Sequence, residues 1–131
     1  MNLAVVLGSL IGLERELAHR PAGLRTHALV CLGSCLFAVI SVHSFSMDAK
    51  IAAAIVTGIG FIGAGNIIAT RGHIRGITTA ASLWAVAGIG IAVGVGSYIL
   101  GTVTTFLAVV ILRFKRVEKP PRAHKRKGPI F

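Results

Sequence analysis

His27, Cys31 and Cys35 are the residues whose types and spacing come closest to a metal site. Steps of four residues place the imidazole and both thiols on one stripe of a helix, where a soft metal ion would accept them. Zinc usually takes four ligands, however, and the nearby sequence offers no clear fourth. Cysteine in an apolar helix commonly packs as a small hydrophobic residue. We therefore predict no metal, no cofactor and no disulfide here. Because no carboxylate orients His27, we also predict no catalytic role for Cys31.

Residues 58–63 read Gly-Ile-Gly-Phe-Ile-Gly and match the dinucleotide-binding pattern G-x-G-x-x-G. That site requires a strand before the glycines, a helix that opens at them, and an acidic residue about 20 positions later. Here the glycines lie inside an apolar segment, and residues 78–83 read Thr-Thr-Ala-Ala-Ser-Leu. We interpret the match as accidental and predict that the chain is not an enzyme.

Polar side chains gather around two short linkers, at residues 14–25 and 71–76. In one interpretation they are structural, because Glu–Arg pairs hold linkers together and hydroxyls bond to backbone groups. In the other, the two linkers form one docking surface or pocket on the cytoplasmic face. We predict that two glutamates and two arginines form one charge network there. The predicted functional surface consists of Glu14, Glu16, Arg25, Asn66, Arg75, Thr78 and Thr79.

The segments that must position these residues are predicted to be membrane helices. No charge occurs between Arg75 and Arg113, and this stretch is long enough for two crossings at about 20 residues each. The chain is 54% hydrophobic with a mean hydropathy of +0.81, and its 14% of charged residues is far below the roughly 25% of soluble proteins. We predict an all-α fold, a polytopic helical membrane bundle of five transmembrane helices. They are expected at residues 1–13, 24–45, 51–70, 77–95 and 97–112.

The domain prediction is one transmembrane domain, residues 1–112, followed by a basic cytoplasmic tail, residues 113–131. The first segment is short for a crossing, which suggests a truncated start. Connections at residues 14–25 and 71–76 are basic, as is the tail, whereas those at residues 46–50 and 94–97 are not. The positive-inside bias then places the N-terminus outside and the C-terminus in the cytoplasm.

The tail contains eight of the fourteen Lys and Arg residues. Basic residues beside a membrane favour anionic lipids, so we expect membrane lipids as its partner. The tail lacks interleaved aromatic residues that could stack on bases, so we expect no nucleic acid partner.

Small residues are expected to pack the helices, because close backbone approach drives helix association in lipid. Gly-x-x-x-Gly patterns occur at Gly8 and Gly12 and at Gly90 and Gly94. We expect small-residue faces to bring the third and fourth helices tightly together. A homo-oligomer formed through one such face is an alternative. The expected faces are Ala53, Thr57, Gly60 and Ala64 on the third helix, and Ala81, Ala85, Gly88, Ala92 and Gly96 on the fourth.

Three distinctive blocks follow one another in the chain, at residues 12–27, 58–65 and 74–84. Together they resemble the MgtC/SapB family of bacterial membrane proteins. Residues 12–16 and 20–27 resemble its opening signature, residues 58–65 its glycine-rich third helix, and residues 74–84 the start of its fourth helix. The resemblance implies a five-helix inner-membrane protein linked with growth under magnesium limitation and, in some pathogens, with survival inside host cells. It also implies regulation of membrane ATPases and ion homeostasis. Some members have Asn at the position of Thr78 and Cys at that of Ala85, so functions tied to those side chains do not carry over.

Magnesium prefers carboxylate and water ligands, so a transport pathway should place a carboxylate within the membrane. The four acidic residues, Glu14, Glu16, Asp48 and Glu118, all fall in predicted linkers or the tail. The resemblance, together with the lack of a carboxylate in the membrane, leads us to predict a non-enzymatic membrane protein that binds a membrane ATPase or another membrane protein and so regulates ion or magnesium homeostasis. The alternative is a magnesium or other ion transporter or channel that uses carbonyls, hydroxyls and Asn66, particularly as an oligomer.

Overall fold

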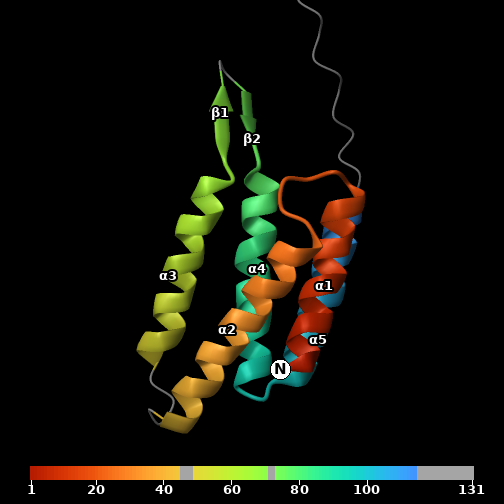
Figure 1. The fold of residues 1–131 in the computed structure, drawn as a ribbon. Helices are drawn as coiled ribbons and strands as arrows, with labels where there is room; N and C mark the ends of the chain where they lie inside the picture. Colours follow the sequence, from red (N-terminus) through yellow and green to blue (C-terminus); the bar gives the residue numbers. More distant parts are fainter. Residues whose placement is uncertain (45–48, 71–72, 115–131) are drawn as a thin grey trace, which may run out of the picture.

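The computed structural model describes residues 1–44, 49–70 and 73–114, and within them it contains five helices and one short hairpin (Figure 1). The predicted tail therefore lies outside the described residues, apart from Arg113 and Phe114. The elements in chain order are α1 (Asn2–Leu17), α2 (Leu24–Ser44), α3 (Ala49–Gly65), β1 (Ile68–Thr70), β2 (His73–Arg75), α4 (Ile77–Gly94) and α5 (Tyr98–Arg113).

The five helices lie close to the predicted segments, with two differences that bear on the site. Helix α1 continues to Leu17, so Glu14 and Glu16 lie in its last turn and not in a linker. Helix α3 ends at Gly65, five residues before the predicted end. The chain then forms a short antiparallel hairpin in which Ile68 pairs with Arg75, so the described fold is all-helical except at the end of the predicted third segment. Isoleucine and threonine favour strands, which agrees with the short apolar run after Gly65.

Two glycines with positive φ fix the ends of α4. Gly76 precedes the helix at φ 93°, and a Cβ atom there would collide with the carbonyl oxygen of Asn66. Gly96 follows the helix at φ 86°, and the backbone N–H groups of Gly96 and Ser97 donate to the carbonyls of Val93 and Ala92. This pair of bonds is the Schellman motif, in which glycine ends a helix without steric strain.

Helix α2 packs closely against both α1 and α4. A Cβ atom on Gly8 would lie 2.7 Å from the Cβ of Cys31, and one on Gly12 would lie 2.6 Å from the Cα of Leu24. On the other side of α2, a Cβ atom on Gly90 would collide with the carbonyl of Cys31. Both predicted Gly-x-x-x-Gly patterns therefore face α2, where only a hydrogen atom fits between the backbones.

The predicted small-residue face of α3 does not form such a contact. Ala53, Thr57, Gly60 and Ala64 are all exposed, and α3 buries only Ile59 and Gly63. The expectation that this face packs tightly against the fourth helix is therefore wrong for the single chain. The expected stripe of α4 is also mostly unburied, since only Ala92 among its five residues is buried.

The outer surface of the bundle is strongly apolar. Helices α2 and α4 are long and apolar enough to span a bilayer, whereas α3 and α5 are apolar but shorter. Large hydrophobic side chains on several helices point outward; Phe61 is 85% exposed, Ile99 82% and Phe106 68%. Exposed apolar surface of this kind marks contact with a membrane or a partner.

Candidate functional site

The seven residues predicted to form the functional surface lie at one end of the bundle. This end contains the last turn of α1, the first turn of α2, the hairpin and the first turn of α4 (Figure 1). The shared end follows from the alternating direction of successive helices. The individual contacts differ from the predicted charge network.

The ion-pair partner of Glu14 is Arg15, not Arg25 or Arg75. The Nε atom of Arg15 donates to the Oε2 atom of Glu14 at 2.5 Å, and its Nη2 atom donates to the carbonyl oxygen of Leu112 at 3.3 Å. Arg15 is only 3% exposed although it lies in the last turn of α1. The guanidinium thus joins the end of α1 to the end of α5, where it satisfies a carbonyl that α5 cannot bond internally.

Glu16 stabilises the start of the next helix. Its Oε2 atom accepts a hydrogen bond from the backbone N–H of Leu24 at 2.9 Å. A carboxylate at a helix N-terminus satisfies a free donor and interacts favourably with the helix dipole. Glu16 therefore holds the α1–α2 connection in shape.

Arg25 and Arg75 are both exposed, and among the described residues neither forms an ion pair with Glu14 or Glu16. The prediction of one network that joins the two glutamates to these arginines is wrong for the described structure. The physical reason is that Arg15 and the backbone of Leu24 lie nearer in the fold and occupy the two carboxylates.

The other predicted residues have separate environments. Asn66 follows α3, and its side-chain amide donates to the carbonyl of Ile62 at 3.1 Å. Thr78 is exposed, whereas Thr79, in the same turn, is only 1% exposed. The exposed side chains at this end, which a ligand or partner could contact, therefore include Arg25, Arg75 and Thr78.

A buried hydrogen-bonded chain that the sequence interpretation missed links the α1–α2 connection to α4. The Nδ1 atom of His27 lies 2.9 Å from the carbonyl oxygen of Gly23, which can only accept, so Nδ1 carries a hydrogen. The Nε2 atom lies 2.9 Å from the Oγ atom of Ser82, whose hydroxyl also lies 2.8 Å from the carbonyl of Thr79. A polar residue within the first six residues of each apolar helix was the available signal for this pair.

The stripe of His27, Cys31 and Cys35 belongs to the core. Both cysteines are free and at most 1% exposed, and they pack with Leu7, Ile11 and Val86. No group of three potential metal ligands occurs among the described residues.

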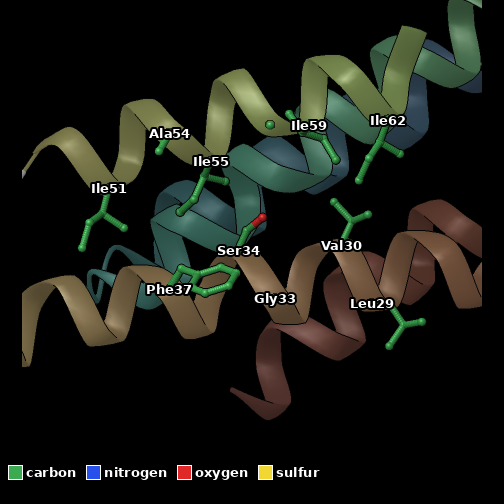
Figure 2. A pocket seen from close by; sticks show the side chains of 11 residues that line it. Leu29, Val30, Gly33, Ser34, Phe37, Ile51, Ala54, Ile55, Ile59 and Ile62 are labelled. Carbon is green, nitrogen blue, oxygen red and sulfur yellow. The ribbon is translucent and has the colours of Figure 1, made fainter. Parts of the chain in front are cut away.

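An apolar groove of about 530 Å³ separates α2 from α3. Figure 2 shows side chains of both helices pointing into it, including Val30 and Phe37 from α2 and Ile55 and Ile62 from α3. Gly33 and Gly58 also line it, and a Cβ atom on either glycine would meet no atom within 4 Å. The groove thus exists partly because both helices lack a side chain where they face each other.

Comparison with known proteins identifies one family and several relatives of this chain. Residues 1–119 match the model of the MgtC family. The putative magnesium transporter YhiD of Escherichia coli (strain K12) is 42% identical over 120 residues, which cover 84% of this chain and 56% of that protein. Protein MgtC of Salmonella typhimurium (strain LT2) is 45% identical over 115 residues, which cover 84% of this chain and 49% of that protein.

An uncharacterized protein of Haemophilus influenzae is 40% identical over 125 residues, which cover 86% of this chain and 52% of that protein. This chain therefore spans about half the length of the curated relatives it matches. No solved structure matches it.

Proposed function

This chain belongs to the MgtC family, and from that membership we propose that it is a bacterial inner-membrane protein that contributes to magnesium homeostasis. It acts without catalysis, by binding another membrane protein, such as a membrane ATPase, within the bilayer. The printed name of one relative, the putative magnesium transporter YhiD, supports the link with magnesium.

The groove between α2 and α3 carries the proposed mode of action. It is lined almost wholly by apolar side chains, and Gly33 and Gly58 are among its lining residues. Transmembrane helices associate through small residues that let their backbones approach. A partner helix can therefore approach the groove at these glycines and insert side chains between α2 and α3.

The exposed polar end of the bundle supports the same mode of action. Arg25, Arg75 and Thr78 lie there and are exposed. A partner that packs along the groove reaches them at the membrane surface, where charged contacts set its register and specificity. We therefore retain the seven predicted residues as a proposed functional surface, with Glu14 and Glu16 in supporting positions.

Two matched substitutions test the role of the groove. Gly58→Leu places a side chain in the groove at a position where a Cβ atom meets nothing within 4 Å, and Gly88→Leu adds the same side chain to α4 at a position equally open at Cβ. Growth of a strain that lacks its own family member, under magnesium limitation, measures activity. We expect the Gly88→Leu variant to restore growth and the Gly58→Leu variant to fail, at equal levels of inserted protein. Full growth with Gly58→Leu would contradict the proposal.

Photo-crosslinking tests partner binding directly. A photoreactive amino acid at Phe37 or Ile62, which line the groove, should crosslink to a partner protein in native membranes. The same amino acid at Ile99, which is exposed on α5 outside the groove, should react with lipid alone. Arg75→Ala should weaken growth and lower the crosslink yield while the protein still inserts. Equal yields at Ile99 and Ile62 would show that the groove is not the docking surface.

The second candidate function is transport of magnesium, which the printed name of the YhiD relative favours. The absence of any acidic residue between Asp48 and Glu118 leaves α3, α4 and α5 without a carboxylate, which disfavours a pathway through one copy. Purified protein in liposomes separates the two candidates. Saturable magnesium uptake above that of empty liposomes would establish transport and overturn the regulatory proposal.

A further inference from the structure

A second groove, of about 370 Å³, runs between α1 and α5. Its walls are leucines of α1 and apolar side chains of α5, among them Leu7, Leu10, Leu13, Leu17, Phe106 and Val109. Thr102 and Thr105 also line it, but their hydroxyls donate to the carbonyls of Tyr98 and Gly101, at 2.9 and 2.8 Å. Since these hydroxyls already have acceptors, the groove presents an apolar wall along its length.

The groove has about the length of a hydrocarbon chain in one leaflet. From Leu7 to Leu17 it follows α1 for about 15 Å at 1.5 Å per residue, which is half of the roughly 30 Å bilayer core.

The charges of the groove lie at one end. Glu14 and Arg113 are its charged lining residues, at the C-terminal ends of α1 and α5. Arg15 neutralises the Glu14 carboxylate and contacts the carbonyl of Leu112. Arg113 is exposed, and no described residue pairs with it. The uncompensated charge at the mouth of the groove is therefore a guanidinium, at the end of the bundle that the positive-inside bias assigns to the cytoplasmic membrane surface.

We propose that the α1–α5 groove binds one acyl chain of an anionic phospholipid, whose phosphate is held by Arg113. A guanidinium forms strong bidentate hydrogen bonds with phosphate. An apolar chain gains little by leaving bulk lipid, so the headgroup contact provides the selectivity. Seven further Lys and Arg residues follow Arg113 in the sequence and raise the local concentration of anionic lipid.

Tryptophan quenching by brominated lipids tests this site. The single native Trp84 is replaced by Phe, and one new Trp is introduced at Phe106, which lines the groove, or at its neighbour Leu107, which is exposed but does not. Each protein is reconstituted into vesicles with brominated phosphatidylglycerol or brominated phosphatidylcholine as a minor component. The neighbouring positions lie at the same depth but on different faces of α5.

We expect the tryptophan at position 106 to be quenched at about fivefold lower mole fraction of phosphatidylglycerol than of phosphatidylcholine. This ratio corresponds to about 1 kcal/mol for one basic residue near the membrane surface. At position 107 the two lipids should quench equally or nearly so. Arg113→Gln should remove most of the selectivity at position 106, and Arg113→Lys, which keeps the charge, should retain most of it.

Three results would overturn the proposal. Equal quenching by both lipids at position 106 means that the groove does not select anionic lipid. Selectivity that survives Arg113→Gln means that Arg113 does not hold the headgroup. Failure of either lipid to quench at position 106, with normal quenching at position 107, means that protein covers the groove, for instance a second copy of this chain.

Discussion

The Nε2 atom of His27 and the Oγ atom of Ser82 lie 2.9 Å apart across the interface between α2 and α4, although 55 residues separate them in the chain. His27 is fully buried and Ser82 is 5% exposed. Through Gly23, the same imidazole is bonded to the α1–α2 connection. The pair therefore ties the polar end of the bundle to the start of α4, which bears Thr78 and Thr79 of the proposed surface.

Ser82→Ala removes the partner of a buried ring nitrogen. We expect a loss of about 1–3 kcal/mol in the free energy of unfolding, the usual cost of an unsatisfied buried polar group. Thermal unfolding in detergent micelles measures it. Ser9→Ala is the control, because Ser9 is half-buried on α1 and has no side-chain hydrogen bond within the described part of the chain.

In a double-mutant cycle that combines Ser82→Ala with His27→Ala, the coupling free energy should be about 1 kcal/mol. Additive effects would show that the contact contributes nothing.

Gly90→Ala should separate α2 from α4. The added methyl group would collide with the carbonyl of Cys31 and lie 2.8 Å from the Cβ of Ser34. Overpacking of this kind typically costs about 1–3 kcal/mol. Gly88→Ala, two residues earlier on the same helix, meets nothing within 4 Å and should leave stability unchanged or raise it by about 0.5–1 kcal/mol. The unfolding midpoint of the Gly90→Ala variant should be lower than that of the Gly88→Ala variant. Similar midpoints would contradict the close packing of α2 against α4.

Arg15→Ala should destabilise the bundle more than Arg25→Ala. The first change removes a hydrogen-bonded ion pair with Glu14 and the contact to the carbonyl of Leu112, whereas Arg25 is exposed. Hydrogen bonds to charged groups contribute about 1.5–3 kcal/mol, so a loss of that size is expected for Arg15 and close to zero for Arg25. Proteolysis at the α1–α2 connection reports the same difference. A larger loss of stability in the Arg25→Ala variant than in the Arg15→Ala variant would support the charge network predicted from the sequence.

Cysteine labelling tests the predicted orientation. Cys31 and Cys35 are buried and are replaced by Ala to provide a background without thiols. In intact cells, a membrane-impermeant maleimide should label Ser97→Cys, in the α4–α5 connection, because the positive-inside bias places it outside. Arg25→Cys and Arg75→Cys should react only after the cells are opened. Labelling of Arg75→Cys in intact cells would reverse the orientation.

The sequence by itself determined where the helices lie and which family the chain belongs to. Apolar stretches are local signals that can be recognised without knowledge of the fold. The motif blocks at residues 12–27, 58–65 and 74–84 pointed to the family that the comparison then identified. The hairpin at residues 68–75 was missed because three-residue strands leave a weak pattern inside a long apolar run.

Tertiary structure alone decided which faces and which side chains meet. A membrane helix is apolar on all sides, so its hydrophobic pattern does not mark the face that packs inward. For this reason the sequence could not show that the small-residue face of α3 is exposed, whereas the glycines of α1 and α4 contact α2. The same limit applies to the charges. The sequence offers no basis for choosing among Arg15, Arg25 and Arg75 as the partner of a glutamate. The fold places only Arg15 between Glu14 and the end of α5.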